Sequence, residues 1–181
     1  MARAPDHPQR RRARAAALVV AAGIGLAAPA GAAVAGGCMR PPVDAVVVDH
    51  FRDPPCPWCA GNRGLQYATV PGDAVRAAVA GVVTFAGLVA GVRYVVVAHA
   101  DGLRATYGGL ASSPLAAGDR LPAGAVVGTA GASLHFGIRR GDAYLDPEPL
   151  LGELRLRPRL VPTDGTPPRA APPPRLRCPA G

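Results

Sequence analysis

The clearest chemical signal in this 181-residue chain is a pair of cysteines in the motif C-P-W-C, residues 56–59. Cysteines at this spacing can form a redox centre, supply half of a zinc site or close a small disulfide loop. A redox centre needs a helix after the motif to lower the thiol pKa, whereas residues 60–64 read as a turn. A zinc site would recruit His50 or His135. We favour the disulfide loop, because the chain also carries an export signal.

The N-terminal segment has the layout of that signal. Arg10 to Arg14 supply positive charge, residues 15–28 form an apolar run, and residues 30–32 (Ala-Gly-Ala) form a cleavage site. The apolar run is too short to span a bilayer comfortably. We therefore expect residues 1–32 to be a signal peptide, residues 33–42 to be a linker, and the protein to be secreted or in the cell envelope. An uncleaved segment would allow transient membrane association.

Export to an oxidising compartment makes all four cysteines candidates for disulfides. Four cysteines allow three pairings. The economical pairing joins Cys56 to Cys59 and Cys38 to Cys178, because Cys38 and Cys178 stand just outside the two ends of the candidate domain. The second bond would tie the tail, residues 152–181, back to the entrance of the domain. Closing so long a loop contributes about 4 kcal/mol in the chain-entropy estimate.

Length and composition predict one modest β domain. The chain is rich in glycine (23) and proline (21), and its aromatic content is only 4%. Short apolar runs between residues 43 and 151 alternate with turns and show no sustained helical period. We predict an all-β fold, an antiparallel β-sandwich or partly open barrel. The expected strands are residues 64–70, 74–80, 82–89, 94–98, 103–107, 125–129, 134–139 and 143–145.

The net charge of +8 does not belong to the candidate domain. Residues 1–37 carry five arginines and one acid, and residues 151–181 carry six arginines and two acids. Residues 38–150 are neutral, with nine arginines and nine acids. Binding of nucleic acid calls for basic residues gathered on a folded face with interleaved aromatics. We therefore predict no nucleic-acid partner.

Eight short segments in this region together resemble the LytM/lysostaphin-type zinc metalloendopeptidases of peptidoglycan. They follow one another in the family's order, with plausible spacing. The segments are GNRGLQYA (61–68), GVVTFAG (81–87), YVVVAHADGL (94–103), TYGGL (106–110), GDR (118–120), GTAG (128–131), SLHFG (133–137) and YLDP (144–147). The resemblance covers about residues 43–151, and it implies an antiparallel β core.

The resemblance also implies a zinc site and two assisting histidines, but most of their positions hold other residues here. The His and Asp of the family's H-x-x-x-D motif fall at Asn62 and Gln66. The third ligand, the second His of an H-x-H motif, falls at His135. The two assisting histidines fall at Gly109 and Ser133. Only His135 keeps the residue type of the family.

These replacements weaken metal binding and proton transfer together. A catalytic zinc needs three imidazole, thiolate or carboxylate ligands and an open position for water. The neutral amides of Asn62 and Gln66 have neither the charge of a carboxylate nor the basicity of an imidazole. Gly109 has no side chain, and Ser133 cannot shuttle a proton at neutral pH. We expect no cofactor, with zinc only if the family activity is retained, and a structural role for His135.

The resemblance and these losses together predict an exported, noncatalytic metalloendopeptidase-like domain. Its expected role is to bind peptidoglycan or to regulate a cell-wall hydrolase. The expected binding groove is flanked by Asn62, Gln66, Tyr107, Ser133 and His135, because amide and hydroxyl groups can hydrogen-bond to peptide amides. The alternative is an active peptidoglycan metalloendopeptidase with an unorthodox metal site, so enzymatic activity stays open.

Overall fold

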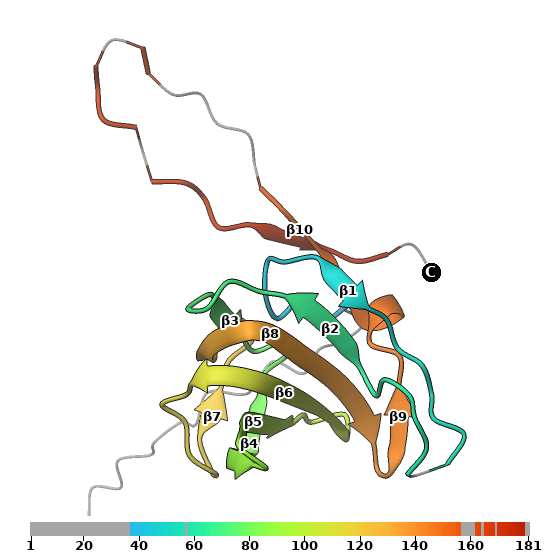
Figure 1. Cartoon of the computed structure of the whole chain (residues 1–181). Helices are drawn as coiled ribbons and strands as arrows, with labels where there is room; N and C mark the ends of the chain where they lie inside the picture. Colours follow the sequence, from blue (N-terminus) through green and yellow to red (C-terminus); the bar gives the residue numbers. More distant parts are fainter. Residues whose placement is uncertain (1–36, 57, 157–161, 164, 169, 180–181) are drawn as a thin grey trace, which may run out of the picture. The chain divides into compact units, whose positions relative to one another are not determined.

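The computed structural model describes residues 37–56, 58–156, 162–163, 165–168 and 170–179 (Figure 1). The predicted signal peptide, residues 1–32, lies outside the described residues. In the part of the chain that is described, no helix is long and apolar enough to cross a membrane.

The regular secondary structure of the described chain is almost entirely antiparallel β, as the sequence predicts (Figure 1). One sheet has the strand order β1-β2-β8-β6-β5-β4-β7, and β3 and β9 also pair with β8. The elements are β1 (Val47–Asp49), β2 (Leu65–Ala68), β3 (Ala74–Arg76), β4 (Gly81–Val89), β5 (Val92–Ala98), β6 (Leu103–Ser112), β7 (Arg120–Leu121), β8 (Val126–Arg140), β9 (Ala143–Leu145), the 3-10 turn η1 (Glu148–Leu150), and the separate ribbon of β10 (Glu153–Arg155) and β11 (Arg175–Arg177). The sheet is open, because β1 and β7 stand at its two ends.

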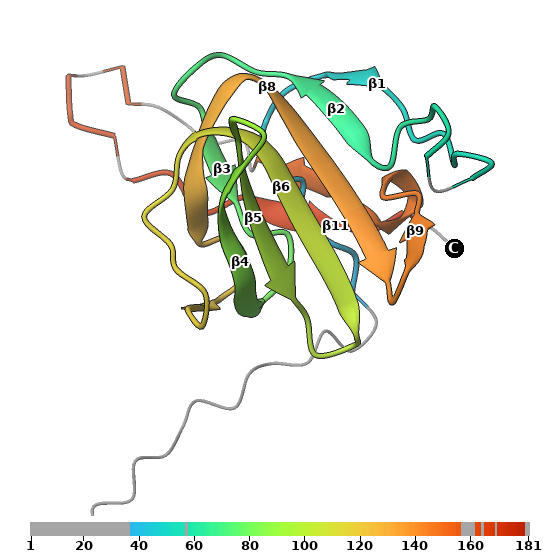
Figure 2. The same ribbon diagram turned by 60° about the horizontal axis from the view of Figure 1, so that its bottom comes forward.

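The longest strand, β8, differs from the sequence prediction. We expected two separate short strands, 125–129 and 134–139. In the structure the first part of β8 pairs with β3, the second part pairs with β2, and β6 pairs with both parts. Gly128 allows this close packing, since a Cβ there would overlap the backbone oxygen of Ser112. Figure 2 shows β8 running the length of the sheet beside β6.

Successive side chains of a strand face opposite sides of the sheet. On β2, β6 and β8, one set of side chains therefore enters the core and the other set faces the site. One set of side chains is fully buried, and the Tyr107 and Phe136 rings have centroids 5.4 Å apart within it. The core residues on these strands include Leu65, Tyr67, Ala105, Tyr107, Leu110, Leu134, Phe136 and Ile138. The intervening positions face the other way. In register, His135 lies opposite Gln66 on β2 and opposite Gly108 on β6.

The segment before β1 belongs to the domain, although we expected residues 33–42 to be a linker. Met39 is buried and forms a parallel bridge with Leu151. Its N–H donates to the Leu150 oxygen at 2.8 Å, and its oxygen accepts from the Gly152 N–H at 2.8 Å. The physical reason is that both ends of the domain meet here, where the Cys38–Cys178 disulfide closes. The predicted Cys56–Cys59 disulfide is also present.

Candidate functional site

The side chain of Gln66 joins the two site residues of β8. Its amide oxygen lies 3.3 Å from the Nδ1 atom of His135. Its amide nitrogen donates a hydrogen bond to the hydroxyl of Ser133. The pairing of β2 with β8 fixes this arrangement, because Gln66 is in register with His135 and Ala68 with Ser133. Three of the predicted site residues therefore meet in one hydrogen-bonded group.

The electrostatics of this group favour a neutral imidazole. Burial lowers the pKa of His135, because removal from water disfavours the charged form. Since the Gln66 oxygen is the acceptor, the Nδ1 atom of His135 carries the proton. The Nε2 atom lies beside Gly137, where a Cβ would be 3.2 Å away. His135 therefore presents one available nitrogen to the groove.

The side chain of Asn62 stabilises the loop that precedes β2. Its side-chain nitrogen donates to the backbone oxygens of Asp49 at 3.2 Å and His50 at 3.0 Å. Its backbone pairs with Arg52, the two N–H groups each donating at 2.9 Å. Asn62 is buried, although it also lines the groove. Its donors therefore hold residues 49–52 in place.

Gly109 excludes a side chain as well as lacking one. Its φ of +79° lies in the left-handed region, where L-residues are strained. A Cβ at this position would overlap the backbone oxygen of Ser133 on β8. A histidine at position 109 would therefore require β6 and β8 to move apart.

The expectation that Tyr107 lines the groove is wrong. Its side chain is 0% exposed and lies among the core residues. Its hydroxyl accepts a hydrogen bond from the N–H of Ala78 at 2.8 Å, and burial raises the pKa of this phenol. Tyr107 follows the regular alternation of β6, because Leu103 and Ala105 also face the core. The pairing of β6 with β8 is irregular only beyond it, between Gly108 and Leu110, where both Gly108 and Gly109 line the groove.

The donor set does not fit a catalytic zinc. Gln66 uses both ends of its amide within the chain, and Asn62 uses its nitrogen to hold a loop. One imidazole nitrogen of His135 is then the only strong zinc donor among the positions that correspond to the family's ligands. Among the described residues, no group of three or more His, Cys, Asp or Glu side chains lies close enough to hold a metal ion. His50 instead pairs with Glu148 at 3.0 Å.

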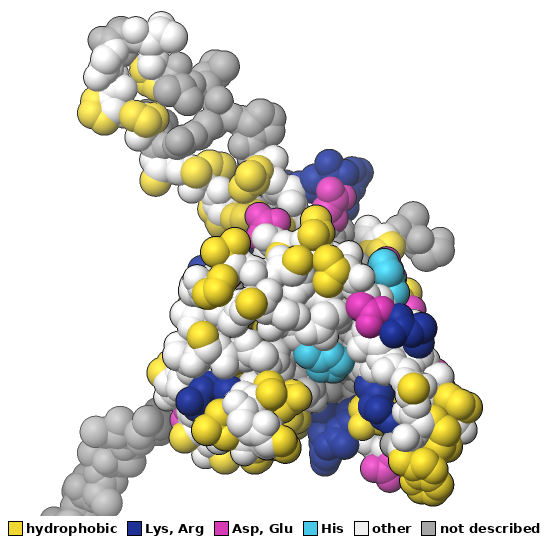
Figure 3. All heavy atoms as spheres, viewed as in Figure 1, with side chains coloured by type: hydrophobic (Ala, Val, Ile, Leu, Met, Phe, Trp, Pro, Cys, Tyr) yellow, Lys and Arg dark blue, Asp and Glu magenta, His cyan; other side chains and the backbone are white. Residues whose placement is uncertain are grey.

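The groove is nevertheless a real cavity of about 600 Å³. Sequence reasoning found Asn62, Gln66 and His135 in its lining but missed the aromatic and basic residues beside them. These additional residues are Arg63, Tyr94, Arg139 and Tyr144. Figure 3 shows the face that holds this cavity, with basic side chains gathered in a hollow between two apolar rims. Alternation from His135 through Gly137 to Arg139 could have identified the arginine on β8.

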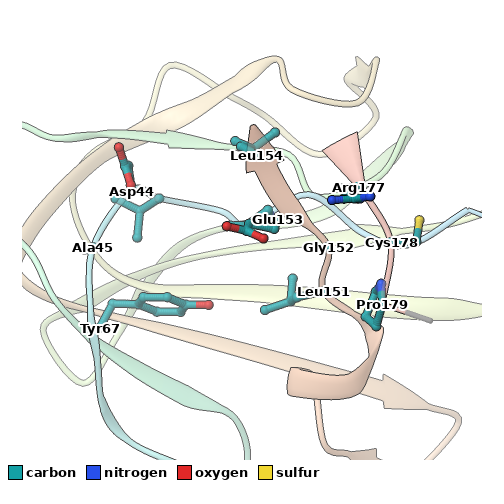
Figure 4. A pocket seen from close by; sticks show the side chains of 12 residues that line it. Asp44, Ala45, Tyr67, Leu151, Gly152, Glu153, Leu154, Arg177, Cys178 and Pro179 are labelled. Carbon is teal, nitrogen blue, oxygen red and sulfur yellow. The ribbon is translucent and has the colours of Figure 1, made fainter. Parts of the chain in front are cut away.

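A second cavity of about 610 Å³ lies between β2 and the tail ribbon (Figure 4). Figure 4 shows the Tyr67 ring and the Glu153 carboxylate directed into it. Burial raises the pKa of Tyr67 to about 12, and repulsion by Glu148 adds to the effect. This cavity exists only with the tail in place, because Arg177 and Cys178 form part of its wall.

Comparison with known proteins matches part of this chain to one family. The sequence model of peptidase family M23 matches residues 60–147. An uncharacterized protein of Mycobacterium tuberculosis (strain ATCC 25618 / H37Rv) is 36% identical over 140 residues, which are 70% of this chain and 55% of that protein. The chain thus spans about half the length of the curated relatives it matches.

Solved structures agree in fold. Helicobacter pylori Csd3 is 25% identical with a TM-score of 0.56, over 65% of this chain and 35% of that one. SpoIIQ, in the structure of the SpoIIQ–SpoIIIAH pore forming complex, superposes with a TM-score of 0.57 at 22% identity, over 64% of this chain and 91% of the other. Residues 60–147 form a LytM-type domain of peptidase family M23.

Proposed function

We propose that this protein is a noncatalytic M23 domain of the cell envelope that binds peptidoglycan through its groove. The observation that carries the proposal is the amide of Gln66, which hydrogen-bonds to both Ser133 and His135 where the family places a zinc ligand. A carboxylate there would attract a cation, whereas this amide is neutral and already satisfied. The group therefore supports the shape of the groove and supplies no metal chemistry.

The cavity supports a binding role. Its volume of about 600 Å³ falls within the range of small-molecule and peptide sites. Its lining includes groups that suit peptides, namely the Nε2 nitrogen of His135 and the rings of Tyr94 and Tyr144. The arrangement supports recognition of peptide units by hydrogen bonds.

An extracytoplasmic location is part of the proposal. It is supported by the two disulfides, which persist in oxidising compartments. The predicted signal peptide, residues 1–32, points the same way. Peptidoglycan is then the polymer that surrounds the protein.

A partner protein, such as a cell-wall hydrolase under regulation, is the second candidate. Large apolar side chains are exposed on two parts of the domain, with Trp58 87% exposed on the disulfide loop and Leu88 61% exposed near the β4–β5 turn. Exposed apolar groups of this kind are typical of protein interfaces. The solved neighbour SpoIIQ was itself determined in complex with SpoIIIAH, a precedent for partner binding on this fold.

Retention on isolated cell walls tests the proposal. The full exported chain is compared with a groove variant, Gln66→Ala with Tyr94→Ala, at low and high salt. A second variant, Arg175→Gln with Arg177→Gln, removes charge from the tail and leaves the groove intact. A third, Trp58→Ala, removes the most exposed apolar side chain.

Groove binding predicts that retention survives high salt and loss of the tail charges but falls in the groove variant. Retention that disappears with the tail charges or with salt, and ignores the groove variant, would show attraction to anionic wall polymers instead. No retention of the intact chain, together with capture of a wall hydrolase that Trp58→Ala abolishes, would favour the partner function.

A further inference from the structure

The groove has a strong charge asymmetry. Two arginines, Arg63 and Arg139, line it, and none of its lining residues is an aspartate or glutamate. A third arginine, Arg104 on β6, is in register with Arg139 on β8. Positive charge is therefore concentrated at this end of the cavity.

Strand alternation directs Arg139 into the groove. His135, Gly137 and Arg139 follow one another on the same face of β8, and all three line the cavity. Gly137 has no side chain, and the backbone oxygen of Arg63 and the Nε2 atom of His135 take up the space beside its Cα. The Nε atom of Arg139 is buried and has no hydrogen-bond partner among the described residues. None of the ion pairs in the described chain includes Arg139.

Arg63 reaches the same end of the groove. Its guanidinium carbon lies 5.5 Å from the centre of the Tyr144 ring, a cation–π contact. Tyr144 on β9 is in register with Arg139 on β8. Tyr144 thus connects the two arginines, one through its ring and one through the strand pairing.

We propose that this end of the groove binds the free carboxylate of a short peptide, with Arg139 and Arg63 as the specificity-determining residues. Both guanidinium groups line a cavity whose lining holds no aspartate or glutamate, so an anion that enters it is attracted rather than repelled. A carboxylate also matches the fork of N–H donors on a guanidinium. His135 also lines the cavity, where its Nε2 atom can meet the peptide units before the carboxylate.

This inference rests on the proposed function, because it names the part of a wall peptide that the groove recognises. It predicts that uncrosslinked peptide ends, which keep a free carboxylate, bind better than peptides whose terminus is blocked. A cross-linked terminus is an amide and offers neither the charge nor the second oxygen. The protein would then distinguish open wall peptides from closed ones.

Binding of a matched pair of probes tests the inference. The probes are N-acetyl-trialanine with a free C-terminus and the same peptide as its C-terminal carboxamide, titrated into the full 15N-labelled chain up to 10 mM. Acetate is the third probe, and it carries the charge without the peptide. The variants are Arg139→Gln and Arg63→Gln, with Arg140→Gln as the control, because Arg140 is its neighbour on β8 but does not line the groove.

The free acid is expected to bind at least about tenfold more tightly than the carboxamide, because a charged hydrogen bond is lost with the carboxylate. Amide resonances of Gly108, Gly137 and Arg139 should move, and either groove substitution should weaken the free acid about tenfold while Arg140→Gln leaves it unchanged. Because two groove variants are measured, the experiment still decides the question if one of them fails to fold.

Equal binding of acid and carboxamide, no binding of the acid at 10 mM, or equal losses in Arg140→Gln and Arg139→Gln would each overturn the inference. If acetate bound as tightly as the peptide acid, the inference would also be overturned, because the groove would then recognise any small anion and not a peptide terminus. Retention on cell walls tests the proposed function separately, so the two can fail independently.

Discussion

Gln66 and His135 face each other across β2 and β8, with the Gln66 Oε1 atom 3.3 Å from the His135 Nδ1 atom. The resemblance places two zinc ligands of the family at these positions. In this chain a direct hydrogen bond joins an amide and an imidazole there.

Removal of the Gln66 amide should destabilise the domain. Gln66→Ala leaves the half-buried His135 Nδ1 without its partner, so we expect a loss of about 1–3 kcal/mol in the free energy of unfolding. The measurement is urea denaturation, with Ser112→Ala as the control, because Ser112 and Thr129 form an exposed cross-strand bond. A loss no larger than that of the control would show that Gln66 does not organise the site.

Gly109 should tolerate no side chain. Gly109→Ala and Gly102→Ala introduce a methyl group at nearly the same φ, +79° and +82°, but only the methyl group at 109 overlaps backbone. We expect both to lose stability from left-handed strain and Gly109→Ala to lose at least about 1 kcal/mol more. Equal losses in thermal or urea unfolding would contradict the proposed close approach of β6 to Ser133.

The Cys38–Cys178 disulfide should hold the tail ribbon on the domain. Cys38→Ser with Cys178→Ser removes a cross-link between residues 140 apart, for which chain entropy predicts a loss of about 4–5 kcal/mol. Limited proteolysis should then cut the tail first. Cys56→Ser with Cys59→Ser removes a cross-link between residues only 3 apart and should leave the tail protected. Equal protection in both variants would contradict this role.

Tyr67 should make stability fall at high pH. Its pKa is raised from 10.0 to about 12, so above pH 10 the unfolded chain releases a proton that the folded chain keeps. Stability is complete below pH 10 and falls up to about pH 12. Between pH 9 and pH 11 the wild type should lose about 1.4 kcal/mol more than Tyr67→Phe. Equal losses in urea denaturation at the two pH values would show that Tyr67 is not desolvated.

The sequence predicts much of the site because its motifs lie on paired strands. Asn62, Gln66 and His135 line one cavity, as the resemblance implies, and the pattern of short runs and turns predicts the all-β class. Tyr107 was misplaced because it continues the core-facing alternation of Leu103 and Ala105. Gly109 shares its parity but lines the groove, because the pairing of β6 with β8 is irregular between Gly108 and Leu110.

The basic end of the groove could not be predicted in the same way. Arg63 follows a loop and Tyr144 lies on a short strand after a turn, so their approach depends on how β9 pairs with β8. The same holds for the packing of residues 38–42, which needs the chain ends to meet. Long-range placement of this kind leaves no local periodic signal.

Zinc stoichiometry combined with wall digestion tests the central claim most directly. The purified, export-processed protein is incubated with equimolar zinc, desalted and analysed by metal mass spectrometry, and the same sample is added to isolated cell walls with and without chelator. The account predicts far less than one zinc ion per chain and no loss of wall turbidity. One tightly held zinc ion per chain, with wall lysis that a chelator abolishes, would contradict it.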